Sequence, residues 1–266
     1  MPATIDPRPH ATPNMEPEYE VRLQLNPATV LDNEHKLKQC VLSTFNMPKS
    51  VKKLNVQFLD TDCKEIYSAG WSPRIRKTEK EEELELTYKK RYPITGTDID
   101  AALNEAAKDG FDAGAAKYEA QVEWGYQKHT LSISRKKSVA DPEDDEMDLP
   151  KTRKSQKLLI DEAPDKFNNW KHCNWGAKAL SESRIFGPVL ARRSIGTWSG
   201  MKLFVEVWPL LNAAKTDIEH IVEASFKTES RTTAFAEQRR LAEVVQSKGW
   251  FLPEDALKTH LIMQRY

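Results

Sequence analysis

The sequence predicts an α+β fold built on a large antiparallel sheet or a closed β-barrel, with helices between pairs of strands. About eight segments alternate apolar and polar residues, which is the period of a β-strand. Several of these segments follow one another at hairpin-like spacing, which favours antiparallel neighbours. Segments with a helical spacing of apolar residues separate pairs of strands, as in α+β folds.

The expected strands follow from this alternation. In the first, Tyr19, Val21 and Leu23 form an apolar face opposite a charged one. Residues 71–77 and 83–92 flank a charged turn and are expected to form a hairpin. The eight expected strands are residues 17–27, 51–61, 71–77, 83–92, 117–126, 128–137, 201–210 and 219–227.

Helices are expected where apolar residues recur at intervals of three or four. The segment 97–110 has Thr97 as a plausible N-cap and Gly110 as a stop signal. A short helix is expected after Pro253, and the role of the C-terminal helical segment is left open between plugging the barrel, packing outside it and mediating a dimer. The other expected helices are residues 26–45, 163–180 and 228–250.

Two segments are expected to lack regular structure. Residues 1–15 contain several prolines and are expected to form a flexible tail. Residues 138–157 are charged and nearly devoid of large apolar side chains, so a mobile loop is expected there. The segment "LARRSIGTW", residues 190–198, is interpreted as a loop.

The composition restricts the class of protein. The 266 residues allow one large domain or two small ones, and 40 basic residues balance 40 acidic ones. This balance argues against nucleic-acid binding driven by overall charge. No apolar run approaches the roughly 18 residues of a membrane span, and the N-terminus lacks the layout of a signal peptide. Three widely spaced cysteines predict neither a disulfide framework nor a zinc site. We expect a soluble, cytoplasmic protein that does not associate with membranes.

At least five strands repeat one design, with a clean apolar face opposite a face that mixes carboxylates with Arg or Lys. The simplest interpretation is an open sheet whose charged face lies in water. The alternative is a barrel whose charged faces line a cavity, where burial without partners would be costly. Arginines bind phosphate oxygens, and clustered carboxylates bind Mg²⁺ or Mn²⁺. A closed arrangement therefore indicates a metal–polyphosphate ligand.

Four motifs occur in a defined order along the chain. They are "EYEVR" (residues 18–22), "FLDT" (58–61), "WSPRIR" (71–76) and "LTYKKRY" (86–92), followed by late acidic strands around Glu206 and Glu223. In this order the chain resembles the CYTH superfamily, the triphosphate tunnel metalloenzymes, whose first strand carries Glu-x-Glu-x-Lys. The resemblance covers residues 16–228, and residues 229–266 are interpreted as a helical extension of the same domain. It implies a closed eight-stranded antiparallel barrel with helices outside, a divalent metal (Mg²⁺ or Mn²⁺) and a small-molecule substrate that carries a triphosphate or similar group.

The resemblance also implies roles for individual residues. The implied metal ligands are Glu18, Glu20, Glu206 and Glu223. The implied phosphate-binding residues are Arg22, Arg74, Arg76, Lys89, Arg91 and Lys227, with Arg192 or Arg193 as a further contact. The implied catalytic residues are Glu20, Arg22, Lys89 and Glu223. Each of these residues could instead be a partner in a neutral salt-bridge lattice, and for Glu119, Glu123 and Lys202 the two interpretations are equally balanced.

Two departures from the family pattern bear on function. Arg22 stands where the family has lysine, and a guanidinium does not replace a compact ammonium at a geometric site. The late Glu-x-Glu pair is missing, because Phe204 and Trp208 flank Glu206 on its face. Such aromatic surface suits the organic part of a substrate, although it could equally close the end of the barrel.

Three functions are therefore considered. The first is a metal-dependent hydrolase of an inorganic or organic triphosphate. The second is a lyase or cyclase of nucleotide or prenyl type that releases pyrophosphate from the same kind of tunnel. The third is a non-catalytic module that binds polyphosphate or a nucleotide. The substrate, the number of metals and the oligomeric state, a homodimer included, are left open.

Overall fold

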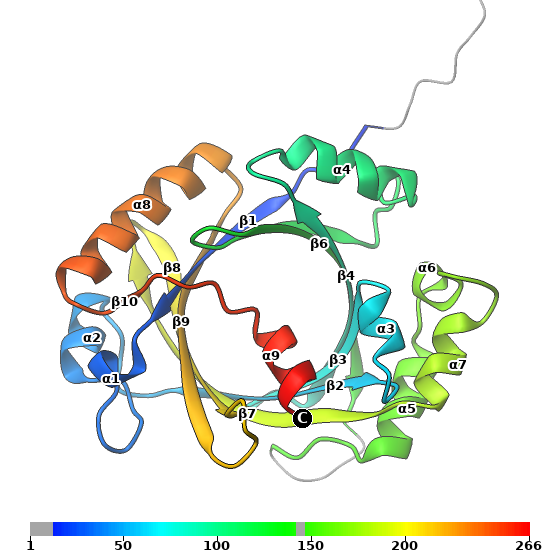
Figure 1. The fold of residues 1–266 in the computed structure, drawn as a ribbon, viewed down its shortest axis with the longest axis horizontal. Helices are drawn as coiled ribbons and strands as arrows, with labels where there is room; N and C mark the ends of the chain where they lie inside the picture. The colour runs from blue at the N-terminus through cyan, green and yellow to red at the C-terminus, as the bar shows by residue number, and fades with distance from the viewer. Residues whose placement is uncertain (1–12, 142–146) are drawn as a thin grey trace, which may run out of the picture.

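A closed β-barrel forms the centre of the molecule (Figure 1). The computed structural model describes residues 13–141 and 147–266. The nine strands of the barrel in this part of the chain are β1 (Glu18–Leu25), β2 (Lys52–Asp60), β3 (Trp71–Thr78), β4 (Glu83–Ile94), β5 (Glu119–Trp124), β6 (His129–Ala140), β7 (Arg184–Trp198), β8 (Met201–Leu211) and β9 (Ile218–Thr228).

The pairing of the strands closes the sheet on itself. The order is β1-β5-β6-β4-β3-β2-β7-β8-β9, and β9 pairs again with β1 over seven residues on each strand. The predicted α+β fold with a closed barrel is confirmed. Two details of the prediction are wrong: the barrel has nine strands rather than eight, and β1 runs parallel to β5, so the sheet is mixed rather than wholly antiparallel.

The additional strand is β7, which contains the segment 190–198, so the prediction of a loop there is wrong. Gly187, Pro188 and the adjacent Arg192 and Arg193 interrupt the alternation that identifies the other strands. Gly196 has a packing reason, because a Cβ atom there would lie 2.1 Å from the carbonyl oxygen of Phe45. A glycine that weakens the strand pattern in the sequence, Gly196, is thus required by the packing of that strand.

Helices fill the connections between strands. They are α1 (Pro27–Val30), α2 (Gln39–Thr44), α3 (Glu65–Ser68), α4 (Ile99–Lys108), α5 (Thr152–Asp161), α6 (Asp165–Asn168), α7 (Trp175–Ser181), α8 (Arg231–Ser247) and α9 (Lys258–Arg265). The expected helices over 26–45 and 163–180 are each divided into two short ones. The N-cap of α4 is Asp98 rather than Thr97, because the Asp98 side chain accepts a hydrogen bond from the backbone N–H of Ala101.

The segments expected to be irregular are shorter than predicted. Strand β6 continues to Ala140 and α5 begins at Thr152, so the prediction of a loop over 138–157 is wrong at both ends. Residues 142–146 within that prediction, and residues 1–12 of the predicted tail, lie outside the described residues.

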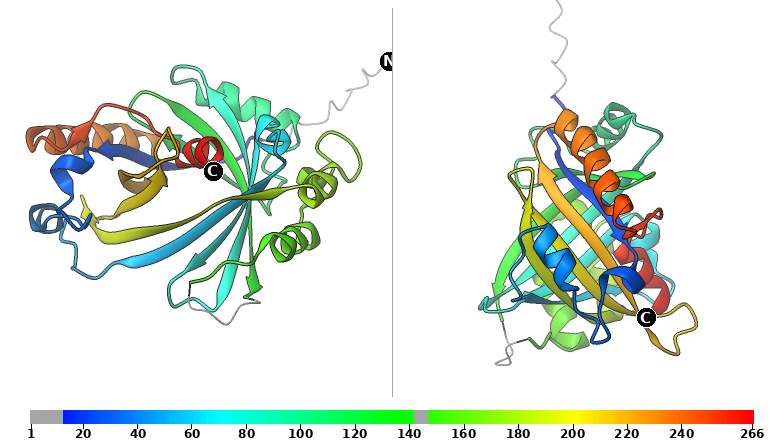
Figure 2. Two further views of the ribbon diagram at one scale, coloured as in Figure 1. Left: turned by 60° about the horizontal axis from the view of Figure 1, so that its bottom comes forward. Right: turned by 90° about the vertical axis from the view of Figure 1, so that its left-hand side faces the viewer.

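Apolar side chains on the outer surface of the barrel pack against the helices. Helix α8 covers β1 and β9 and buries Leu241 and Val245, and α4 covers β4 and β6 and buries Leu103 (Figures 1 and 2). This outer layer contains most of the hydrophobic core. Because the helices cover the apolar faces, the opposite faces of the strands point into the barrel. No helix in the described part of the chain is long and apolar enough to cross a membrane.

The C-terminal segment enters the barrel. A short strand, β10 (Phe251–Leu252), pairs with the end of β1, and the chain then leads to α9, which lies inside the ring of strands (Figure 1). Helix α9 packs against β7 and β8 and forms a second apolar cluster within the barrel. The members of this cluster are Leu54, Val56, Phe58, Phe186, Val189, Ala191, Trp208, Leu210, Ile262 and Met263. Of the roles that the sequence leaves open for the C-terminal helical segment, the structure shows packing outside the barrel for α8 and a plug for α9.

Candidate functional site

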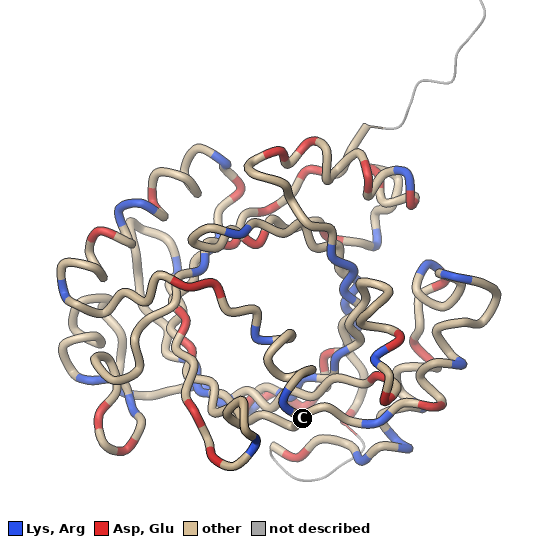
Figure 3. The backbone as a smooth tube through the Cα atoms, in the orientation of Figure 1, with Lys and Arg blue, Asp and Glu red and all other residues tan. Residues whose placement is uncertain are grey.

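The part of the barrel that α9 leaves free is a charged cavity of about 1180 Å³. Among the described residues, nine basic and nine acidic side chains line it, mainly from β1, β3, β4, β5, β8 and β9. Figure 3 shows basic and acidic positions distributed around the ring of strands. Strand alternation explains this composition, since every second residue points inward and those positions carry the charges. Of the predicted site residues, Lys202 and Arg192 do not line the cavity. The predicted residues that do are Glu18, Glu20, Arg22, Arg74, Arg76, Lys89, Arg91, Glu119, Glu123, Arg193, Phe204, Glu206, Trp208, Glu223 and Lys227.

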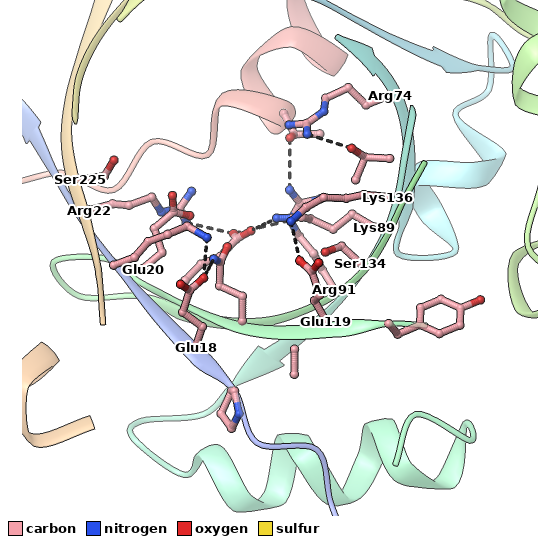
Figure 4. A pocket seen from close by; sticks show the side chains of 18 of the residues that line it. Glu18, Glu20, Arg22, Arg74, Lys89, Arg91, Glu119, Ser134, Lys136 and Ser225 are labelled. Carbon is pink, nitrogen blue, oxygen red and sulfur yellow. Dashed lines mark hydrogen bonds and ion pairs between the residues drawn. The ribbon is translucent and has the colours of Figure 1, made fainter. Parts of the chain in front are cut away.

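Glu123 on β5 is the centre of one group of cations. Its side chain is 2% exposed, and its carboxylate lies 3.0 Å from Nη2 of Arg22 and 2.9 Å from Nζ of Lys89. Nε of Arg91 lies 3.7 Å away. Burial opposes ionisation of this carboxyl group, but Lys89, Arg22 and Arg91 outweigh it and hold the pKa of Glu123 well below its usual range. Figure 4 shows Arg22, Lys89 and Arg91 converging on this region from β1 and β4.

A second group of cations lies on β3. Arg74 and Arg76 are two residues apart, so their side chains share the inner face, as the sequence predicts. Glu85 on β4 accepts a hydrogen bond from each guanidinium, at 2.8 Å and 2.6 Å. Arg74 also donates to the hydroxyl of Thr87 at 2.9 Å. Burial and the neighbouring Arg74 lower the pKa of Arg76 to about 10. The two arginines are therefore held side by side with their forks in the cavity.

The two acids of the first strand differ in their partners. Glu18 accepts hydrogen bonds from Gln121 at 2.9 Å and from Lys227 at 2.5 Å. Glu20 is half-buried and faces the cavity, and no hydrogen bond or ion pair links its carboxylate to another residue in the described part of the chain. Glu20 is thus an inward carboxylate whose oxygens remain available to a ligand.

The carboxylates of Glu206 and Glu223 both have hydrogen-bond and ion-pair partners. Glu206 and Glu223 face each other across β8 and β9, and both are buried. Nζ of Lys258, at the first position of α9, lies 2.8 Å from Oε2 of Glu206 and 2.6 Å from Oε1 of Glu223. Arg193 binds the other oxygen of Glu206 at 2.7 Å, and Gln24 donates to the other oxygen of Glu223 at 3.1 Å. Burial alone would make Glu206 harder to ionise, but Lys258 and Arg193 lower the pKa of Glu206 below its usual range.

The predicted aromatic residues lie beside these charges. The ring of Phe204 is 4.8 Å from the guanidinium carbon of Arg193, within the range of a cation–π contact. The indole N–H of Trp208 donates to Glu206 at 2.8 Å, and Lys258 lies 5.0 Å from the Trp208 ring. Trp208 is 6% exposed and belongs to the inner apolar cluster, whereas Phe204 is half-buried and faces the cavity.

Strand geometry accounts for the positions of the remaining predicted residues. Of the pair Arg192 and Arg193, only Arg193 points into the cavity, because consecutive residues of a strand point to opposite faces. Lys202 is exposed and lies outside the cavity. Glu119 lines the cavity near its mouth and is paired with Lys136.

Several residues of the site are not among the sequence predictions. Lys136, Ser134 and Ser225 share the inner faces of expected strands, so the alternation of those strands could have identified them. Glu85 and Thr87 likewise alternate with apolar residues in "ELELTY". Lys258 could not be found in this way, because a single lysine on a short terminal helix has no pattern that points to the barrel.

The ligands for a divalent cation are few in the protein itself. No group of three or more His, Cys, Asp or Glu side chains among residues 13–141 and 147–266 is arranged to hold a metal ion. Glu20, with Glu18 two residues away on the same face, supplies a pair of carboxylates at one side of the cavity. Mg²⁺ commonly binds through one or two carboxylates together with substrate phosphates and water, so this pair fits such an ion.

Comparison with solved structures identifies the fold. A candidate adenylate cyclase from Bacillus halodurans matches with a TM-score of 0.52 and 12% identity, over 92% of this chain and 97% of that one. A candidate adenylyl cyclase from Hippeastrum, described as having a dominant triphosphatase activity, matches with a TM-score of 0.50 and 12% identity, over 91% and 93% of the two chains. No protein-family sequence model and no curated protein matches the chain.

The closed barrel identifies the fold of the chain. It is the fold of the CYTH-type, triphosphate-tunnel proteins, and this chain has that fold. The resemblance that the sequence motifs indicate is confirmed as a likeness of fold. At 12% identity the likeness concerns the fold, so the reaction must be argued from the residues of this chain.

Proposed function

We propose that the protein is a metal-dependent hydrolase that cleaves a triphosphate-bearing substrate, inorganic or organic, in the charged cavity. The observation that carries this proposal is the position of Glu20, an inward carboxylate that makes no hydrogen bond or ion pair in the described part of the chain, near the partly buried cations Arg22 and Lys89. A carboxylate left available among cations is the arrangement that a cation–phosphate complex requires, because the cation binds the carboxylate and the phosphates bind the basic groups.

The charge of the cavity supports the need for a metal. The nine basic and nine acidic side chains that line it in the described part of the chain balance, so these residues do not neutralise a polyphosphate on their own. A divalent ion supplies the missing positive charge and polarises the phosphoryl group. Mg²⁺ or Mn²⁺ would be held by Glu20 and Glu18 together with substrate oxygens.

The cationic residues have distinct tasks in this proposal. Arg74 and Arg76 present two adjacent guanidinium groups, which can hold the oxygens of one phosphoryl group and stabilise the charge that develops on it. Arg22 and Lys89 bind a second phosphate and are kept in place by Glu123. Lys227, which is exposed and paired with Glu18, would contact the substrate as it enters the cavity. Glu223 is not used as a base, because both of its oxygens already accept hydrogen bonds.

The experiment is a panel of phosphate and pyrophosphate release assays with Mg²⁺ and Mn²⁺. Substrates are inorganic tripolyphosphate, nucleoside triphosphates, thiamine triphosphate and prenyl diphosphates. We expect metal-dependent release of orthophosphate that is lost in Glu20→Gln and Arg74→Ala and kept in Glu243→Gln and Lys202→Ala, whose targets are exposed and outside the cavity. A folded protein that releases phosphate from none of these triphosphates would overturn the proposal.

A second candidate function is a lyase or cyclase that binds the diphosphate or triphosphate and releases pyrophosphate. It is favoured by one apolar part of the cavity wall, the half-buried ring of Phe204, which faces the cavity beside Arg193. An organic group would pack on such a wall, whereas inorganic triphosphate has no use for it. Pyrophosphate together with a rearranged organic product would support this function. Orthophosphate together with the organic diphosphate, without pyrophosphate, from every organic triphosphate that is turned over would exclude it. Tight binding without turnover would instead support a binding module.

A further inference from the structure

The carboxylates of Glu206 and Glu223 are bridged by a cation that the protein itself supplies. Lys258 places one ammonium group within 2.8 Å of Glu206 and 2.6 Å of Glu223. A bridge between two facing carboxylates is the position that a divalent ion takes in a two-carboxylate site. The side chain of Lys258 is 17% exposed and those of the two acids are 6% and 2% exposed, so the bridge is largely shielded from water.

The other oxygens of the pair are also saturated. Oε1 of Glu206 accepts from Arg193, Oε2 accepts from Trp208 in addition to Lys258, and Oε2 of Glu223 accepts from Gln24. The two negative charges of the acids are thus matched by the two positive charges of Arg193 and Lys258. No oxygen of the pair is left without a donor.

A divalent ion could enter only by displacing Lys258. Mg²⁺ requires near-octahedral coordination and gives up its water reluctantly, while the donors around this pair are fixed hydrogen-bond groups rather than ligands. Displacement would also leave a lysine ammonium in a buried position without its partners, which is strongly unfavourable. The ion would further lie next to Arg193, a like charge, at Glu206.

We infer that Lys258 replaces a second divalent ion, so that the cavity holds a single metal, at Glu18 and Glu20. The metal role that the family resemblance implies for Glu206 and Glu223 is thereby assigned to a side chain of α9. This inference refines the proposed function, because it fixes how many ions the site uses. The plug helix also gains a second role, since it carries a permanent charge of the site as well as closing the barrel.

The test counts bound Mn²⁺ by calorimetry and by electron paramagnetic resonance, without substrate, so that it is independent of turnover. We expect Lys258→Met to bind one more Mn²⁺ than the wild type, because methionine fills a similar volume without charge. Lys258→Arg, which keeps the charge, and the exposed control Lys202→Met should bind the same number as the wild type. The additional ion should be absent from the double variant Lys258→Met/Glu223→Gln.

If Lys258→Met does not fold, a second variant tests the same inference. Glu223→Gln in the wild-type background should leave the number of bound Mn²⁺ ions unchanged, because that carboxylate binds no metal while Lys258 is present. Loss of an ion in Glu223→Gln would overturn the inference. So would a folded Lys258→Met protein that gains no Mn²⁺. Failure of the hydrolase proposal would appear separately, as absence of phosphate release with unchanged Mn²⁺ binding.

Discussion

Replacement of Glu123 by glutamine is the substitution whose effect can be worked out most fully. The side chain is 2% exposed and lies close to Arg22, Lys89 and Arg91. Glutamine keeps the shape but removes the charge, so three cations remain close together without their common counter-ion. Removal of one partner of a buried ion pair typically costs about 3–5 kcal/mol. For chains near this size, about 1 kcal/mol lowers Tm by about 2–4 °C, so a decrease of roughly 6–20 °C is expected.

The assay is thermal and urea denaturation of the wild type, Glu123→Gln and a matched control. The control is Glu119→Gln, on the same strand and the same face, where the carboxylate is 64% exposed and paired with Lys136. Exposed pairs contribute about 0–1 kcal/mol, so this variant should melt close to the wild type. If both variants lost less than about 1 kcal/mol, Glu123 would not hold the cations in place, and the reasoning about the site would be wrong.

Three further predictions follow from the same contacts. Arg74→Ala should weaken tripolyphosphate binding about 10- to 100-fold in calorimetry, since a charged hydrogen bond contributes about 1.5–3 kcal/mol. The control Lys202→Ala should leave the binding unchanged. Ile262→Ala, at a fully buried position of α9, should lower the free energy of unfolding by about 2–5 kcal/mol in urea denaturation. Gln264→Ala, at an exposed position of the same helix, should not lower it. Equal losses in the two variants would contradict the packing of α9 inside the barrel. Because the pKa of Glu123 is lowered in the folded protein, this carboxylate contributes stability above about pH 4.3, the pKa of an unfolded glutamate, and that stability is lost as the pH falls below this value. The free energy of unfolding of the wild type should therefore fall more steeply in acid than that of Glu123→Gln. Parallel plots of unfolding free energy against pH would refute this.

The sequence predicts the barrel well because the alternation that identifies each strand is visible within a short segment of the chain. Alternation in segments such as "EYEVRLQL" identifies both the strand and the face that carries its charges. Once several strands carry mixed charges on one face, a closed interior explains them better than an exposed sheet. Arg74 and Arg76 show this clearly, since their spacing alone predicts two adjacent guanidinium groups, and the structure has them bound to one carboxylate.

What the sequence does not predict depends on contacts between distant segments. The parallel pairing of β1 with β5 cannot be seen in either strand, because hairpin spacing informs only on neighbours in the chain. Strand β7 is hidden by Gly187, Pro188 and Gly196, which are breakers in isolation and are accommodated only by the packing around them. Lys258 reaches Glu206 from 52 residues further along the chain, and no periodicity marks it.

The closure of the barrel has a consequence for how the chain acquires its structure. Strand β1 pairs with β9, and Gln24 and Glu223 in that seam are 199 residues apart. During synthesis the first strand therefore leaves the ribosome long before its last neighbour exists. Pairings of such high contact order form slowly, and an unpaired edge exposed meanwhile invites association with other chains. Nascent chains arrested before β9 should thus depend on chaperones more strongly than chains released after it.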